Sequence, residues 1–258
     1  QRAKQLAQAL QSINSQRQDL TTELLAQVKA EIKEQPEEAM VIVAGDYHEG
    51  VIGLLAGKLT EEFSKPSIVI SNTGKVAKAS ARSLADFNIT EFIRLFQNDL
   101  LEVGGHPLAA GFSLLAKKIP ALRRKMLAKA KKLLTGKKLS KTLSIDTELA
   151  DSLVKLSTAQ HLEKFAPFGL ANPQPNFLLR SWQLLSVKSM GKKQEHQKLL
   201  FKDKAGQLQE VLAFQAERRQ LICQPGQSYD LVLELGSQVW QQRPSLQLLL
   251  KARRPAQK

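Results

Sequence analysis

Three short stretches of the sequence combine residue types that can bind phosphate. In KVAKASARS, residues 75–83, a strand conformation would place Lys78, Ser80 and Arg82 on one side. Arginine grips a phosphate through two parallel hydrogen bonds, and a serine hydroxyl adds a neutral donor. The alanines between them would let a nucleotide or another backbone pass close. This stretch predicts a phosphate-binding strand.

The stretch LEVGGHPLAAGFSL, residues 101–114, joins a glycine pair to a histidine. Gly104 and Gly105 have no Cβ, so their backbone N–H groups could form a concave nest for an anion. His106 could donate to a phosphate oxygen or stack on a base. The alternative is a tight turn that links a helix to a strand, with the histidine hydrogen-bonded in its wall.

The stretch GDYHEGVIG, residues 45–53, places Asp46, His48 and Glu49 where a strand is expected to meet a helix. The N-terminus of a helix favours anions, so His48 is a candidate ligand-binding residue. The alternative is helix capping by Asp46 and a surface histidine at position 48.

The surrounding sequence predicts an α/β unit that would hold these stretches together. Residues 39–45 and 67–71 are typical of buried strands, and the amphipathic helix expected at 51–63 between them completes a βαβ pattern. The elements expected beyond them are a strand at 75–83, a helix at 89–98 capped by Asn88 or Asp86, a glycine hinge, a strand at 109–115 and a helix at 120–134.

The first 35 residues contain no glycine or proline and predict one long helix that ends before Pro36. Their apolar residues recur at helical spacing, at Leu6, Leu10, Ile13, Leu20, Leu24, Val28 and Ile32. We expect a connector packed on its neighbours rather than a coiled-coil strand, because the stripe is not accompanied by matching flanking charges.

The charge balance points to a polyanionic partner. Lysine and arginine total 38 against 24 acidic residues, which gives a net charge of +14. Nucleic acid is the first candidate and an anionic membrane surface the second. No apolar run approaches the roughly 20 residues of a spanning helix, and no signal-peptide pattern opens the chain. With one cysteine, Cys223, and therefore no internal disulfide or thiolate zinc cluster, the expected location is the cytoplasm.

The basic residues are concentrated between Lys117 and Lys141, where eleven lysines and arginines occur without an acid. The helix expected at 120–134 would bury Leu122, Met126, Ala130 and Leu133 on one face, which leaves a basic opposite face. This density favours phosphate contact, and the alternative is a solvated helix face.

The C-terminal part predicts a small β-barrel. A strand at 142–146, a helix at 151–164 and a proline-punctuated loop precede five β-like runs, which are typical of an OB fold. Residues 215–222 suggest a short helix, and the last eight residues a frayed tail. Residues Lys188, Lys192, Lys193 and Lys198 surround one hairpin and would line a DNA groove or a solvated loop. The candidate stacking residues, for each of which we favour the core, are Trp182, Phe201, Phe214, Tyr229 and Trp240.

Taken together, these motifs resemble a known family. GDYHEGVIGLLAGKLTEEFSKPSIVIS, ASARS and VGGHPLAAGFSL are similar to the DHH-associated domain of the RecJ single-strand-specific DNA exonucleases. The resemblance continues through FAPFGLANPQPNF into the barrel, and the leading helix with QSINSQRQDL is similar to the connector helix of that family. It therefore covers nearly the entire chain.

The resemblance implies an α+β fold in four segments. These are a connector helix at 1–36, a DHH-associated α/β domain with a mixed sheet at 37–137, a linking strand, helix and loop at 138–175, and an OB-fold nucleic-acid-binding domain at 176–258.

The resemblance also implies function. RecJ enzymes degrade single-stranded DNA from its 5′ end with manganese or magnesium, in DNA repair and recombination. The metal ligands of the family belong to a DHH catalytic domain that precedes the connector helix, and this chain has no Asp-His-His motif, so we expect no catalytic residue and no bound metal here. By resemblance, Arg82 and Ser83 with Gly104, Gly105 and His106 would face that domain and hold the phosphate of the scissile nucleotide.

Two other functions remain open from the sequence. One is a free-standing single-strand-binding or adaptor module without hydrolytic activity. The other is a phosphodiesterase of small nucleotides, which the barrel and the long basic surface argue against, because a dinucleotide needs neither.

Overall fold

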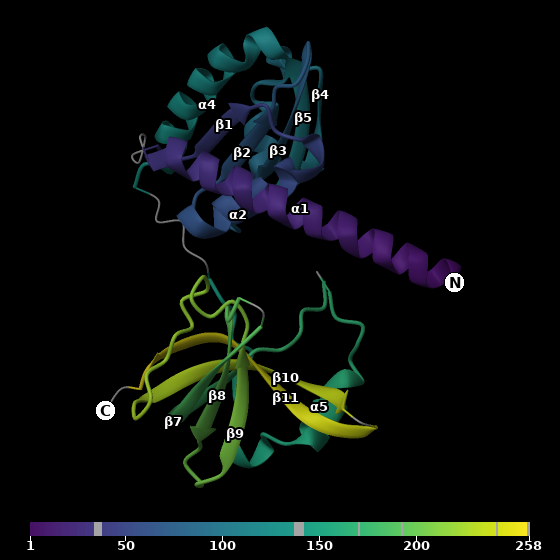
Figure 1. The fold of residues 1–258 in the computed structure, drawn as a ribbon. Helices are drawn as coiled ribbons and strands as arrows, with labels where there is room; N and C mark the ends of the chain where they lie inside the picture. Colours follow the sequence, from purple (N-terminus) through teal and green to yellow (C-terminus); the bar gives the residue numbers. More distant parts are fainter. Residues whose placement is uncertain (34–37, 137–141, 170, 192, 241, 257–258) are drawn as a thin grey trace. The chain divides into compact units, whose positions relative to one another are not determined.

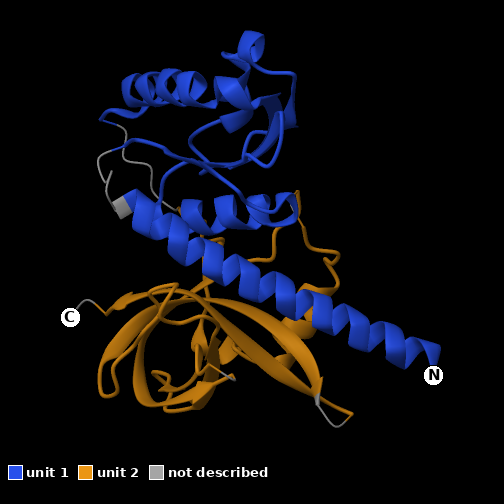
Figure 2. Cartoon of the chain, turned by 45° about the horizontal axis from the view of Figure 1, so that its top comes forward, with its two compact units in different colours: residues 1–141 blue, residues 142–258 orange. Residues whose placement is uncertain are grey.

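The computed structural model of the protein describes residues 1–258 except for 34–37, 137–141, 170, 192, 241 and 257–258. The chain divides into two compact units, residues 1–141 and residues 142–258, which Figure 2 shows in blue and orange. The first unit is a mixed sheet with helices, and the second is a closed β-barrel. The expected α+β fold class is therefore confirmed.

A five-stranded mixed sheet with the order β1-β2-β3-β5-β4 forms the centre of the first unit (Figure 1). Its strands are β1 (Val41–Gly45), β2 (Ser67–Ser71), β3 (Val76–Arg82), β4 (Glu102–His106) and β5 (Ala109–Leu115). Strands β1 and β2 run parallel and are joined by helix α2 (Glu49–Phe63), which is the predicted βαβ unit. The other neighbours pair antiparallel.

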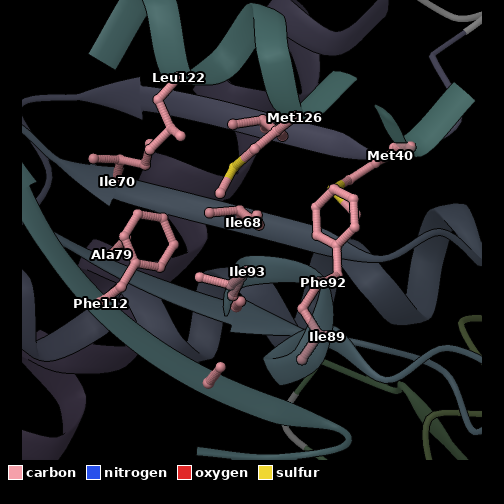
Figure 3. Packing of buried hydrophobic residues seen from close by; sticks show 14 of the residues in the cluster. Met40, Ile68, Ile70, Ala79, Ile89, Phe92, Ile93, Phe112, Leu122 and Met126 are labelled. Carbon is pink, nitrogen blue, oxygen red and sulfur yellow. The ribbon is translucent and has the colours of Figure 1, made fainter. Parts of the chain in front are cut away.

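One face of this sheet is covered by helices α3 (Ile89–Arg94) and α4 (Ile119–Leu134). Figure 3 shows Ala79 and Phe112 of the sheet in the same apolar cluster as Leu122 and Met126 of α4. The alanines of β3, Ala77, Ala79 and Ala81, all belong to this core. Our interpretation that they leave room for a nucleotide is therefore wrong. Their small side chains let the helices pack close to the sheet.

Helix α4 buries the side that its sequence predicted, with one difference. Leu122, Met126 and Ala130 are buried, but Leu134 completes the row and Leu133 is 37 % exposed. Residues four apart form the continuous row along a helix, so the row from Met126 through Ala130 leads to position 134.

Helix α1 (Arg2–Lys33) and α2 pack on the other face of the sheet, where α2 lies over β2 and β3. Only the C-terminal half of α1 takes part, where Leu24 and Val28 are buried. In the N-terminal half, Leu6, Leu10 and Ile13 are 56 %, 67 % and 62 % exposed. The expectation that the whole apolar stripe is packed is wrong within this chain.

Two further expectations in the first unit need correction. The helix expected at 89–98 is shorter, because α3 is followed by a separate turn of 3₁₀ helix, η1 (Gln97–Asp99). Of the two candidate caps, Asn88 is the residue used, and its side chain accepts from the Glu91 amide. The glycine hinge is strand β4, whose pairing with β5 holds both glycines in the sheet.

The second unit is a barrel of five strands (Figure 1). The strands are β7 (Phe177–Met190), β8 (His196–Lys202), β9 (Leu208–Ala213), β10 (Ser228–Trp240) and β11 (Arg243–Pro255). Pairing of β10 with β7 closes the barrel, and β9 and β11 pair in parallel. The OB-type barrel is therefore confirmed.

The structure of the barrel shows which of the candidate stacking residues are buried and which are exposed. Trp182, Phe201 and Tyr229 are almost fully buried inside the barrel, as favoured from the sequence, and Phe214 is 41 % exposed. The side chain of Trp240 lies outside the described residues. The stretch expected to link the two domains also contributes to this core, through Leu149, Val154 and Ala159.

Several local elements of the second unit differ from those expected. The strand expected at 142–146 is instead a two-residue strand, β6 (Thr147–Glu148), and the helix expected at 151–164 divides into η3 (Asp151–Leu153) and α5 (Leu156–Glu163). Of residues 215–222, those up to 220 form turns and the last two have no regular structure, so no helix forms; the Ala216 amide donates to the Glu195 carbonyl. The expected fraying of the tail is not observed up to Pro255, because strand β11 continues to this residue and pairs there with Tyr229 of β10.

No helix in the described part of the chain combines the length and apolar character needed to cross a membrane.

Asp230 on β10 is a buried carboxylate held by two arginines. Its Oδ2 accepts from Arg180 Nη1 and from Arg254 Nε, both at 3.0 Å, and its Oδ1 accepts from the Ser181 amide. Burial of the carboxyl opposes ionisation, but hydrogen bonds from Arg254, Arg180 and the Ser181 amide together hold the pKa of Asp230 below its ordinary value. The network links β7, β10 and β11 at the place where the pairing of β10 with β7 closes the barrel.

We expect Asp230→Ala to lower the free energy of unfolding by about 2–3 kcal/mol, because both arginines lose their shared carboxylate. Urea denaturation measures the loss. Glu148→Ala is the matched control, since that carboxylate also pairs with Arg180 but is 57 % exposed, and it should cost less than about 1 kcal/mol. Equal losses in the two variants would contradict the importance of burial.

The same network predicts a pH dependence of stability. A carboxyl whose folded-state pKa is lowered stabilises the protein above its unfolded-state pKa, and this contribution is lost as the pH falls through the folded-state pKa. The difference in unfolding free energy between the unmodified chain and Asp230→Asn should therefore shrink on acidification. A constant difference would contradict this assignment.

Candidate nucleic-acid interface

The face of the sheet that carries α2 remains open beside this helix, over β5, β4 and part of β3. A groove of about 900 Å³ lies there, lined by the first turns of α2 and by these three strands. We call it the sheet groove. Its floor includes Gly104 of β4 and Gly111 of β5, and Ser80 and Lys78 of β3 line its side.

Strand register explains which side chains share the face of the sheet that holds this groove. Residues paired directly across antiparallel strands point to the same face. Arg82 pairs with Ala109, which pairs with His106, so the arginine and the histidine lie in one cross-strand row, about 10 Å apart at two strand spacings. The next row joins Ser80, Gly111 and Gly104. The structure thus brings together residues from two motifs that are separate in the sequence.

Arg82 is held in place by its own strand. Its Nη1 donates to Ser80 Oγ at 3.1 Å and to the Ala81 carbonyl at 2.8 Å. Among the described residues, no hydrogen bond is formed by its Nε or Nη2, and no carboxylate pairs with it. The guanidinium is therefore oriented and keeps donors for an anionic ligand.

Gly53 of α2 makes room for this arginine. A Cβ built at position 53 would lie 3.3 Å from both Arg82 Nη2 and Ser80 Oγ. Neither Gly53 nor Gly111 was predicted from the sequence as part of the site. The available signal was a glycine inside a helix pattern and another inside a strand pattern, each of which marks a close approach.

The two glycines of β4 have different surroundings. A Cβ at Gly104 would have nothing within 4 Å, whereas a Cβ at Gly105 would lie 2.4 Å from the Ala109 carbonyl oxygen. Gly105 also has a φ of +148°. Because the glycines alternate in a strand, their N–H groups do not form the expected nest. Because Gly104 has no side chain, the backbone at the floor of the groove is exposed. Because Gly105 has none, β5 can approach closely.

His106 is exposed at the end of β4, and its carbonyl accepts from Thr90 Oγ1 at 2.6 Å. Ser83 lies beyond the end of β3. Its hydroxyl donates to the Phe87 carbonyl at 2.7 Å and its amide to the Leu108 carbonyl at 2.9 Å. These hydrogen bonds hold the turn that follows His106. Ser83 therefore affects the position of His106 through the backbone and not by direct contact.

Lys78 lines the groove, and His48 directly precedes Glu49 and Gly50, which line it from α2. His48 caps α2, where its Nδ1 accepts from the Gly50 amide at 3.0 Å, so the expected capping by Asp46 is not observed. Lys78 forms an ion pair with Glu49 at 2.7 Å, and the hydrogen bond from Lys78 to that carboxylate raises the pKa of Lys78. The charge of Arg82 is therefore less compensated than that of Lys78.

The barrel candidates lie on the hairpin between β7 and β8. Lys188 is exposed and pairs across the strands with Lys198, which forms an ion pair with Glu210 at 2.7 Å. Lys193 is exposed in the turn, and Lys192 lies outside the described residues. The exposed Phe214 ring packs on His196 with ring centroids 5.2 Å apart. His196 was not among the residues that the sequence predicted for DNA binding.

The described part of the chain contains no group of three or more histidine, cysteine, aspartate or glutamate side chains able to hold a metal ion. The donor set of these described residues does not fit a metal pair.

Comparisons with known proteins agree with this organisation. Residues 37–132 match the model of the DHHA1 domain, and residues 145–252 match that of the RecJ OB domain. The single-stranded-DNA-specific exonuclease RecJ of Bacillus subtilis is 28 % identical over 96 % of this chain, and that of Dickeya dadantii is 27 % identical over the same share. The chain spans only 32 % and 45 % of these relatives.

The fold also has a close counterpart among solved structures. The crystal structure of RecJ in complex with Mn²⁺ from Thermus thermophilus matches 97 % of this chain with a TM-score of 0.71 and 24 % sequence identity. This chain covers 36 % of that structure. The match shows that the two share a fold.

Proposed function

We propose that this chain, which is homologous to the RecJ exonucleases over 96 % of its length and carries their DHHA1 and OB domains, is the substrate-binding part of a RecJ-like single-stranded-DNA exonuclease. The observation that supports it best is the sheet groove. Ser80 and the exposed glycine backbone of β4 and β5 line this groove, and strand register places Arg82 and His106 in the neighbouring row on the same face of the sheet.

The groove suits a phosphate of an unpaired strand. The guanidinium of Arg82 offers two parallel donors, and Ser80 holds that guanidinium at the correct side of β3. The absence of a side chain at Gly104 lets a sugar-phosphate backbone approach the sheet. His106 donates to a phosphate oxygen or stacks on a base, and the first turn of α2 adds a favourable dipole. In our proposal these groups hold the phosphate of the scissile nucleotide.

The barrel binds a more distant part of the strand. Lys188, Lys192 and Lys193 supply positive charge around one hairpin, and the exposed Phe214 offers a stacking surface. Since Trp182, Phe201 and Tyr229 are buried, charge should outweigh base stacking in this interaction.

Cleavage is the task of a separate partner in this proposal. A DHH catalytic domain N-terminal to the connector helix would supply manganese or magnesium and the hydrolytic chemistry, and this chain would position the strand. The complete enzyme would remove nucleotides in the 5′-to-3′ direction and act in DNA repair and recombination. The single, buried Cys223, which forms no disulfide, is compatible with a cytoplasmic location.

A second candidate function is a single-strand-binding or adaptor module that does not hydrolyse DNA. It is supported by the OB-type barrel with its exposed Phe214 and hairpin lysines, because barrels of this type bind single strands without cleaving them. It predicts the same DNA affinity, with no hydrolysis when the chain is joined to a DHH domain.

Fluorescence anisotropy with a 3′-labelled oligonucleotide of about 20 nucleotides tests the proposal. We expect binding whose log–log salt dependence has a slope of about −0.7 for each phosphate contacted, measured from about 50 to 200 mM salt. The same oligonucleotide with manganese should stay intact with this chain alone and shorten from its 5′ end when a RecJ DHH domain is joined to it. Absence of single-strand binding would contradict the proposed function.

A further inference from the structure

The exposed side of α4 is a second cationic surface, on the opposite face of the sheet from the groove. The helix packs against the face formed by Ala77, Ala79 and Ala81, whereas the groove lies on the face of Lys78, Ser80 and Arg82. Each surface therefore needs its own ligand or its own segment of one ligand.

Four basic residues on this helix have exposed side chains and form no ion pair with another described residue. They are Arg124, Lys129, Lys131 and Lys132, which we call the α4 basic face. Other cations nearby are already engaged. Lys125 pairs with Asp99 at 2.7 Å, and Arg123 Nε donates to the Ile42 carbonyl at 3.0 Å. The helix itself contains no acidic residue.

We propose that the α4 basic face binds the sugar-phosphate backbone of double-stranded DNA. Arg124 and Lys131 are seven residues apart, which places them about 10 Å apart along one side of the helix. This distance is similar to the width of the major groove of B-form DNA, about 12 Å, so the two side chains can reach phosphates of both strands. Ala121 and Ala128, which are exposed and small, let the helix approach the backbone.

The composition of the helix distinguishes a duplex from other polyanions. Single strands are bound through base stacking as well as charge, and α4 contains no aromatic residue. An anionic membrane is bound by helices with an exposed apolar face, but Leu122, Met126 and Leu134 of α4 are buried in the core. A surface of rigid cations without stacking residues matches the regular phosphates of a duplex.

This inference goes beyond the proposed function, because it assigns a different ligand to a different surface. A chain with both sites would bind a DNA end where a single strand leaves a duplex, with the strand in the groove and the duplex on α4.

The test compares two probes and two triple variants by anisotropy. The variant Arg124→Gln, Lys131→Gln and Lys132→Gln should bind a blunt duplex of about 20 base pairs about 10-fold more weakly, and its salt slope should fall by about 2–3. Its affinity for a single strand should change less than about 3-fold. Glutamine preserves helix propensity, and urea denaturation checks the fold.

The charge-matched control replaces Arg2, Lys4 and Arg17 of α1 with glutamine, which changes the net charge equally. An equal loss of duplex affinity in this control would overturn the proposal in favour of a bulk charge effect. It would also be overturned if the unmodified chain did not bind duplex DNA, or if the α4 variant lost binding to phosphatidylserine vesicles while keeping its duplex affinity. Failure of the proposed function would appear separately, as absent single-strand binding.

Discussion

Arg82→Ala is expected to lower the affinity of this chain for a single-stranded oligonucleotide about 10- to 100-fold, since a charge-assisted contact contributes about 1.5–3 kcal/mol. Arg82 lies next to Ser80 on the face of the groove and has no carboxylate partner among the described residues, and its guanidinium is already oriented by Ser80 and the Ala81 carbonyl. Anisotropy titration with a 5′-phosphorylated oligonucleotide measures the loss.

Two variants separate this role from general charge. Arg82→Lys keeps the charge but not the planar pair of donors, so it should recover only part of the affinity. Lys78→Ala should cost less than about 3-fold, because the Lys78 ammonium is already paired with Glu49. Equal losses for Arg82→Ala and Lys78→Ala would contradict an oriented phosphate contact, and an effect of Arg82→Ala on unfolding alone would assign it a structural role.

The adjacent glycines of β4 should respond in opposite ways to the same substitution. Gly105→Ala is expected to lower the free energy of unfolding by about 2–4 kcal/mol, because its Cβ would lie 2.4 Å from the Ala109 carbonyl oxygen and its φ is +148°. Gly104→Ala should change stability by less than about 1 kcal/mol, since a Cβ there has nothing within 4 Å.

DNA binding should show the reverse order. The methyl group added by Gly104→Ala stands on the groove floor and should weaken single-strand binding about 10-fold, whereas the folded fraction of Gly105→Ala should bind almost normally. Urea denaturation and anisotropy on the same two proteins measure both effects. A Gly104→Ala variant with unchanged affinity would show that the strand does not approach the sheet at this point.

The local periodicity of the sequence determined the elements with a continuous pattern. The predicted elements are those with a clear apolar repeat, which arises because each one buries one of its faces or is buried entirely. They are the βαβ unit, strand β3, helix α4 and the five barrel strands. Elements without such a repeat were missed. Strand β4 contains two glycines, and its place in the sheet depends on pairing with β5. The turns at 215–220 depend on a contact with Glu195, far away in the sequence.

The same distinction applies to the candidate site. Residue types at short spacing identified Lys78, Ser80 and Arg82 as one side of a strand, and the structure places all three on the open face. Only strand register placed Arg82 in a row with His106, and only the packing of α2 assigned Gly53 to the arginine. The sequence could not separate Gly104 from Gly105, because identical residues differ only in what approaches them. Neighbouring residues determine which functional groups occur together along a strand. The function of a glycine or a cation also depends on atoms that folding brings close from distant parts of the sequence.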